Sequence, residues 1–123
     1  ISGTPRPGDG DAEDLRVTVE ARGDAIVLAV AGELDMLTAG GLRQAIVTVL
    51  DSRPRVLVVD LSKVEFMASA GMNVLVEADE AAGSATLLRV VATGNVTMRP
   101  LRVTGLAEYL AVFESLDAAL AES

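Results

Sequence analysis

Two uninterrupted apolar runs constrain the fold of this chain more than any other feature of its sequence. Residues 25–31 read AIVLAVA and residues 56–61 read VLVVDL. Such runs are typical of strands that are covered on both faces. Between them, apolar residues recur at the spacing of one buried helix face, at Leu42, Ala45, Ile46, Val49 and Leu50. A helix that crosses between two buried strands predicts that the strands are parallel.

The remaining patterns predict a hairpin before the first run and further elements after the second. LRVTVE at residues 15–20 alternates apolar and polar side chains, and Arg22-Gly23-Asp24 suits a tight turn, which favours an antiparallel pair. Thr38 can cap the first helix. Later elements are a helix over about 70–82 that stops at Gly83, a strand over 86–92, a short strand at 112–113 and a helix over 115–121. Pro100 argues against one long helix after residue 94.

These patterns together predict the fold class and the domain organisation. We expect an α/β fold with a mixed sheet of four to five strands, an antiparallel hairpin first and parallel strands after it, layered by about four helices. A chain of 123 residues fits one domain. Its first ten residues, ISGTPRPGDG, are rich in Gly and Pro, so we expect residues 1–13 to be a flexible leader and residues 14–123 to form the domain.

The charge of the chain excludes several classes of partner. Asp and Glu number 18 against 10 Lys and Arg, which gives a formal net charge of -8. Phosphate backbones and anionic membranes would be repelled, so we expect neither nucleic acid nor a membrane as a partner. The longest apolar runs are far shorter than the roughly 20 residues that a bilayer crossing needs. We therefore expect a cytoplasmic protein.

The chain contains neither Cys nor His. This absence excludes disulfides, thiol nucleophiles, Ser-His-Asp triads and nearly all zinc sites. No P-loop or GxGxxG motif is present either, and ATGNV at residues 92–96 is too short a match to hold a nucleotide. We expect a protein that is not an enzyme and that has no cofactor or metal of its own.

The stretch VEFMASAGMNVLV at residues 64–76 is the candidate functional segment. Ser69 stands directly before the second predicted helix, where a serine commonly caps the first turn. Gly71 is a poor helix former, which suggests that another group approaches the backbone closely. Alanines on both sides leave the Ser69 hydroxyl unshielded, and a phosphate is tolerated at a helix start. Val74 and the alanines after it could face outward, unless a neighbouring helix covers them.

Two segments resemble the STAS domain family of bacterial anti-sigma factor antagonists. VLVVDLSKVEFMASAGMNVLVEA is similar to the family's strand, serine site and helix, and VAGELDMLTAGGLRQAI is similar to its earlier Gly-Glu-Leu-Asp turn and first helix. The resemblance covers about residues 15–121 and implies a STAS fold. It also implies a function: the unphosphorylated protein captures an anti-sigma factor, itself a serine kinase, and thereby frees a sigma factor.

The resemblance further implies how binding is switched. The kinase, which supplies ATP and Mg²⁺, would phosphorylate Ser69 and release the complex, and a serine phosphatase would reset it. The residues expected to contact the partner are Asp35, Thr38, Met67, Ala68, Ser69, Ala70, Gly71, Met72, Asn73 and Val74. The family's motif has an aspartate where this chain has Ala68. Asp35 matches a family acid that lies near the serine and could partly compensate, although a turn residue bonded to its own backbone would look the same.

Two alternatives follow from the same residues. The protein could be a STAS subunit that binds its partner constitutively, with Ser69 kept only as a helix cap. It could also be a receiver-like domain, because VLVVDL places Asp60 at the end of a buried strand, where receivers are phosphorylated.

Overall fold

The computed structural model describes residues 15–121, and the flexible leader expected over residues 1–13 lies outside this range. Within it, five strands form one sheet in the order β1-β2-β3-β4-β5. The strands are β1 (Leu15–Arg22), β2 (Ala25–Leu34), β3 (Val56–Met67), β4 (Leu87–Val91) and β5 (Val112–Phe113). β1 and β2 pair antiparallel, and the later neighbours pair parallel. The predicted mixed sheet is confirmed.

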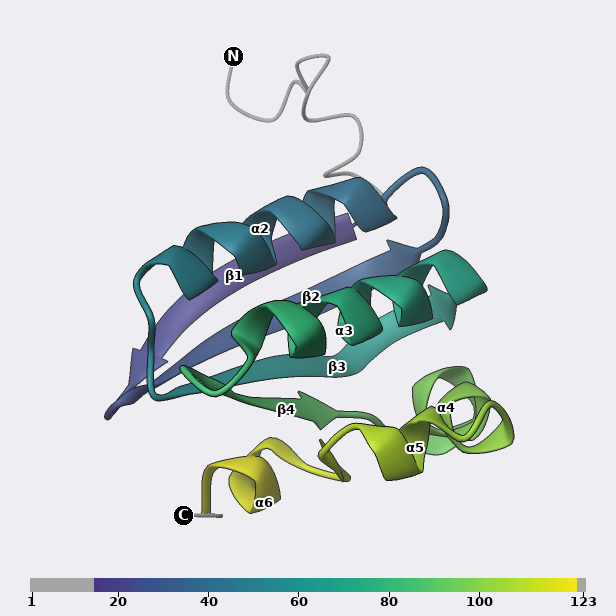
Figure 1. Cartoon of the computed structure of the whole chain (residues 1–123). Coiled ribbons are helices and arrows are strands. Elements are labelled where there is room, and N and C mark those ends of the chain that lie inside the picture. The colour runs from purple at the N-terminus through teal and green to yellow at the C-terminus, as the bar shows by residue number, and fades with distance from the viewer. Residues whose placement is uncertain (1–14, 122–123) are drawn as a thin grey trace.

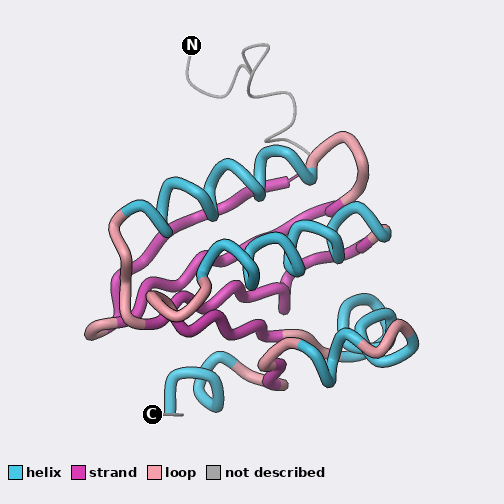
Figure 2. Tube along the Cα trace, in the orientation of Figure 1, coloured by secondary structure: helices cyan, strands magenta, loops and turns pink. Residues whose placement is uncertain are grey.

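Helices lie on both faces of this sheet. They are α2 (Ala39–Asp51), α3 (Ser69–Ala82), the π-helix η2 (Gly94–Met98), α4 (Arg99–Val103), α5 (Leu106–Tyr109) and α6 (Leu116–Ala121). α2 and α3 run side by side over one face (Figure 1), and α6 packs on the other face against β3, β4 and β5. The loops between elements are short along the whole described chain (Figure 2). Over residues 15–121, no helix has the length and apolar character that a bilayer crossing requires.

The core consists of two apolar layers, one on each face of the sheet. Under α2 and α3, Leu28, Leu57 and Leu75 are fully buried. On the opposite face, Val58 packs with Ala119 of α6 in a smaller cluster. Both layers meet in the first half of β3, and this confirms that the apolar run there belongs to a strand covered on both faces.

β3 is longer than predicted, because it continues to Met67 instead of ending at Leu61. The pairing with β2 shifts register twice in this half, which marks β-bulges. Each bulge adds a residue, so the buried positions Leu61, Val64 and Met67 recur every third residue rather than every second. The period-two rule for strands therefore missed this segment.

Pro100 divides the region after β4, as expected. It lies in the first turn of α4, where its missing N–H has no helical partner. Gly105, with a φ of 83°, then separates α4 from α5. The segment is a chain of three short helices, which lies beyond the end of β4 (Figure 1).

Candidate functional site

The site lies where β2 and β3 end together. Leu34 and Met67 are the last paired residues of these parallel strands, and the backbone N–H of Ala68 donates to the carbonyl of Leu34 at 2.9 Å. The turn that begins at Asp35 therefore lies beside the start of α3 (Figure 1). The structure brings together the two segments that the sequence analysis singled out.

Ser69 is exposed and does not cap α3. It is the first residue of the helix, and the cap position belongs to Ala68, whose φ of -93° and ψ of 172° are still extended. The expectation of a serine cap is wrong, because the extended conformation ends at Ala68 and the helix already begins at Ser69. The Ser69 hydroxyl makes no hydrogen bond within residues 15–121. It is an accessible group at the start of a 14-residue helix.

Gly71 is needed for packing inside the protein rather than for contact with a partner. A Cβ at this position would lie 2.5 Å from Cγ of Leu34, which is fully buried, and 3.3 Å from Cγ of Met67. The close approach expected from the glycine is real, but the approaching group is the protein's own Leu34. The glycine lets the first turn of α3 rest directly on the end of β2.

The Asp35 turn is held together by its own polar side chains. Oδ1 of Asp35 accepts hydrogen bonds from the backbone N–H groups of Leu37 at 2.9 Å and Thr38 at 3.0 Å. Thr38 is buried, and its hydroxyl donates to the carbonyl of Glu33 at 2.8 Å while accepting from the N–H of Asp35 at 2.9 Å. Thr38 occupies the cap position of α2 but makes no side-chain cap bond, so that expectation is also wrong. Its hydroxyl is already used by the turn.

The other predicted contact residues divide into supporting and exposed positions. Val74 is 1% exposed and packs in the core cluster that α2 and α3 share, which agrees with the alternative of a covering helix. It cannot contact a partner directly, so that expectation is wrong. Met67 is buried as well. Ala68, Ala70 and Met72 are half-buried, and Asn73 is exposed.

Sequence reasoning missed three exposed apolar side chains in the segments that lead into the site. Met36 and Leu37, in the Asp35 turn, are 81% and 78% exposed, and Phe66 near the end of β3 is 52% exposed. A signal was available, since two large apolar residues stand inside a turn otherwise built from Asp and Thr. We call Met36, Leu37, Ser69 and Asn73 together the Ser69 surface.

An ion pair joins the two helices that flank this surface. Nε of Arg43 on α2 donates to Oε1 of Glu77 on α3 at 2.7 Å. The hydrogen bond and the charge of Glu77 raise the pKa of Arg43. Both side chains are about half exposed, so water and salt screen the pair and its contribution to stability is small.

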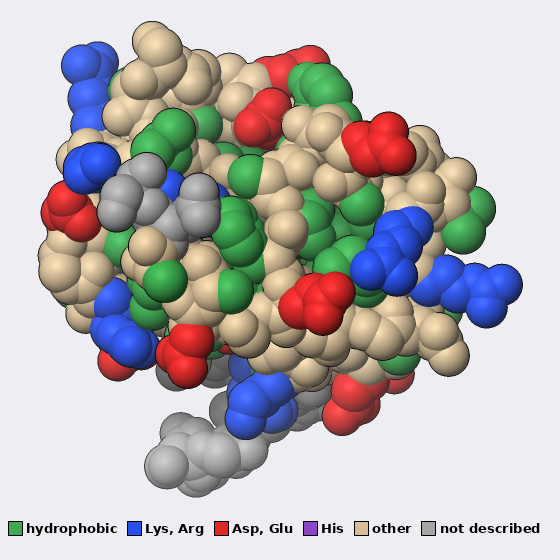
Figure 3. Space-filling model, turned by 90° about the horizontal axis from the view of Figure 1, so that it is seen from below, with side chains coloured by type: hydrophobic (Ala, Val, Ile, Leu, Met, Phe, Trp, Pro, Cys, Tyr) green, Lys and Arg blue, Asp and Glu red, His purple; other side chains and the backbone are tan. Residues whose placement is uncertain are grey.

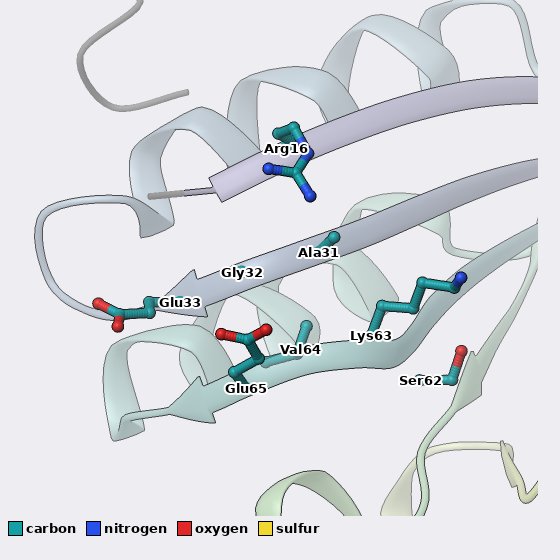
Figure 4. A pocket seen from close by; sticks show the side chains of 8 residues that line it. All are labelled: Arg16, Ala31, Gly32, Glu33, Ser62, Lys63, Val64 and Glu65. Carbon is teal, nitrogen blue, oxygen red and sulfur yellow. The ribbon is translucent and has the colours of Figure 1, made fainter. Parts of the chain in front are cut away.

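A depression on the opposite side of the sheet lacks a net charge. It encloses about 500 Å³, and Arg16 and Lys63 line it together with Glu33 and Glu65 (Figure 4). Two basic and two acidic groups offset one another. This depression favours neither an anion nor a cation.

Asp60 lies in the middle of β3, not at its end, so the premise of the receiver-like alternative is wrong. Its Oδ1 accepts a hydrogen bond from the N–H of Ser62 at 3.0 Å. Within residues 15–121, no three acidic side chains gather in a way that could hold a metal ion.

Comparison with known proteins places this geometry in a family. A family model described as Mlab, STAS domain, matches residues 17–117. The anti-sigma-F factor antagonist RsfB of Mycobacterium tuberculosis is 39% identical over 108 residues, which are 88% of each protein. The crystal structure of an anti-sigma factor antagonist from Mycobacterium paratuberculosis superposes with a TM-score of 0.85 at 39% identity, over 96% of this chain and 97% of that one. A putative anti-sigma factor antagonist from Thermotoga maritima shares the fold, with a TM-score of 0.77 at 19% identity over 86% and 92% of the two chains.

Proposed function

The chain belongs to the STAS domain family, and from this premise we propose that it is an anti-sigma factor antagonist. It binds an anti-sigma factor through the Ser69 surface and so releases a sigma factor. The relatives at 39% identity carry the name of this activity, and their matches span nearly the whole length of each chain. Such a role in transcription would place the protein in the cytoplasm.

The observation that carries the proposal is the unengaged Ser69 hydroxyl beside exposed apolar side chains. Large apolar groups that face water at one place are typical of a protein-binding surface. Met36 and Leu37 are the two most exposed large apolar side chains of the described chain, and both stand in the turn next to Ser69. A partner that covers them would also cover the hydroxyl.

We further propose that phosphorylation of Ser69 switches this binding off. A phosphate adds about -1.5 to -2 charges at neutral pH. Burying that charge against Met36 and Leu37 in a complex would cost its hydration without supplying a partner charge. The start of α3 tolerates the phosphate in the free protein, because the first N–H groups of the helix point toward it.

The enzymes of this switch are partners of the protein. The anti-sigma factor would be the serine kinase and would bring its own ATP and Mg²⁺, and a serine phosphatase would restore the binding form. The missing motif aspartate at Ala68 leaves Asp35 as the nearest acid in the adjacent turn. Only its Oδ1 is bonded to the turn, so Oδ2 is available to a kinase or a partner.

A second candidate is constitutive binding without phosphorylation. The observation that favours it is Ala68, which removes the family's acid from the position before Ser69. The first candidate accounts better for Ser69 itself, because the residue does not cap the helix and has no structural bond to maintain.

The test is to purify the chain, recover its bound partner from the source cell, and measure affinity with the purified partner. Ser69→Ala should bind as the natural chain does, and Ser69→Glu should weaken binding at least tenfold. Ser84→Glu is the matched control, because it adds the same charge at an exposed serine beyond the other end of α3. Incubating the complex with ATP should place phosphate on Ser69.

Each outcome decides between the candidates. Equal binding by Ser69→Glu and Ser84→Glu, with no phosphate on Ser69, would contradict the phosphorylation switch and support constitutive binding. A partner unrelated to anti-sigma factors would overturn the antagonist role altogether.

A further inference from the structure

A second polar depression lies at the carboxyl end of β4. It encloses about 460 Å³ between the loop that follows β4 and the first turns of η2 and α4. Its lining comprises Thr93, Gly94 and Asn95 of the loop, Met98, Arg99 and Arg102 of the two helices, and Glu114. Crevices beyond the carboxyl ends of parallel strands are common ligand sites in α/β proteins.

Arg99 and Arg102 make this depression basic. They stand three residues apart on α4, so both guanidinium groups lie on the same side of the helix. Arg99 forms no ion pair within residues 15–121, and Nη2 of Arg102 lies 3.6 Å from Oε2 of Glu114. That pair is weak, because its side chains are 64% and 77% exposed. Seen from the side of α4, α5 and α6, basic side chains lie next to one another at the end where α4 lies, and others lie at the opposite end (Figure 3).

The two arginines form a basic cluster on a chain that is acidic overall. A net charge of -8 disfavours anions over the surface as a whole. Two arginines with one acid between them are therefore a local reversal of the prevailing charge. We call Thr93, Asn95, Arg99 and Arg102 the Arg99 pocket.

The loop that lines the pocket is held in place while its side chains stay unengaged. The Thr97 hydroxyl accepts from the N–H of Thr93 at 2.9 Å and donates to its carbonyl at 3.0 Å. Gly94 takes a φ of 63°, which turns the chain sharply. The hydroxyl of Thr93 and the amide of Asn95 make no hydrogen bonds among residues 15–121. A rigid loop thus presents free donors beside two guanidinium groups.

We propose that the Arg99 pocket binds a phosphate group, either as inorganic phosphate or as a phosphate ester of a small molecule. Guanidinium groups match phosphate oxygens in pairs, and a phosphate has enough oxygens for both arginines and for a hydroxyl or amide donor. A carboxylate has two oxygens in one plane and carries less charge, so it matches four donor side chains less well than a tetrahedral phosphate does. The site goes beyond the proposed antagonist function, because it uses none of the residues of the Ser69 surface.

The test is a titration followed by amide NMR on the intact chain. One arm uses inorganic phosphate and the other uses glycerol 1-phosphate, each at constant ionic strength against sodium chloride and sodium acetate. The amides of Gly94, Asn95 and Arg99 should shift and saturate with either phosphate, and should not saturate with chloride or acetate. Tighter binding in one arm identifies whether free or esterified phosphate is the ligand.

Substitutions assign the binding to this pocket. Arg99→Gln and Arg102→Gln should each weaken binding about tenfold, as expected for loss of a charge-assisted hydrogen bond. Glu114→Gln should tighten it, because Glu114 competes for Arg102. Arg53→Gln is the matched control, since Arg53 is exposed in the loop between α2 and β3, away from α4.

The proposal would be overturned by shifts that do not saturate, by equal responses to phosphate and acetate, or by unchanged affinity in Arg99→Gln. The dispersion of the amide spectrum verifies that each variant is folded. A negative result in the phosphate titration would not affect the proposed antagonist role, because that role is tested separately by the affinity for the partner protein.

Discussion

The Asp35 turn and the start of α3 lie side by side where β2 and β3 end, and their polar side chains have opposite roles. In the Asp35 turn, the Asp35 carboxylate and the Thr38 hydroxyl are bonded to the backbone of the turn itself. At the start of α3, Ser69 is exposed and bonded to nothing within residues 15–121. A side chain that holds a turn together is committed to stability, whereas a side chain with no such bond is available for chemistry. Substitutions in and around these two segments test this difference.

The largest effect is expected from Thr38→Val. The valine has nearly the shape of threonine but leaves the N–H of Asp35 and the carbonyl of Glu33 without their buried partner. Each such loss costs about 1–3 kcal/mol, and both hydrogen bonds are only partly buried, so the lower end of the range applies and the variant should lose about 2–3 kcal/mol of the free energy of unfolding. Urea denaturation measures it. A loss below 0.5 kcal/mol would mean that the turn does not depend on this hydroxyl.

Gly71→Ala should cost about 1–2 kcal/mol. The new Cβ would press on Leu34, and overpacking of this kind exceeds the roughly 1 kcal/mol that alanine gains in a helix. Gly41→Ala on α2 is the matched control, because a Cβ there meets nothing within 4 Å. The control should be stabilised in the same denaturation experiment. Stabilisation of both variants would contradict the close contact between α3 and β2.

Glu77→Gln should lower the melting temperature only slightly. It removes the charge that pairs with Arg43 between α2 and α3, and the side chains involved are about half exposed. The difference from the natural chain should vanish at high salt, because salt screens exposed pairs. Scanning calorimetry at low and high salt measures it. A difference that persists at high salt would indicate a packing effect instead.

The smallest effect on stability is expected from Ser69→Ala. A capping serine would lose about 1 kcal/mol on this change. Because Ser69 makes no cap bond, the free energy of unfolding should stay within about 0.5 kcal/mol of the natural chain. If urea denaturation showed a loss of about 1 kcal/mol, the value of a helix cap, the Ser69 hydroxyl would be structural. The contrast between the two segments would then be wrong.

Patterns that extend along an element were predictable from the sequence. The apolar runs predicted β2 and the first half of β3, and the helical spacing of Leu42, Ile46 and Val49 predicted the buried face of α2. These predictions succeeded because burial on a regular element repeats with the period of that element. The second half of β3 escaped because its bulges break the period.

The candidate site was predictable in place but not in detail. The motif around Ser69 and the turn at Asp35 were both identified from sequence, and the pairing of Leu34 with Met67 brings them together. The cap at Ser69 and the partner contact at Val74 were wrong, and the exposed Met36, Leu37 and Phe66 were missed. The cap error is local, because it depends on the residue at which α3 begins, whereas the burial of Val74 depends on packing between segments that are distant in the chain.

The sequence by itself therefore determined the order of the main helices and strands, the mixed sheet and the exposed position of a serine at a strand-to-helix junction, because these depend on local order and on periodicity. Only the tertiary structure decided that Leu34 fills the space over Gly71, that α2 covers Val74, and that Arg99 and Arg102 share a depression with the loop after β4. Which atoms meet across elements depends on how the helices pack on the sheet, and no spacing along the chain encodes that packing.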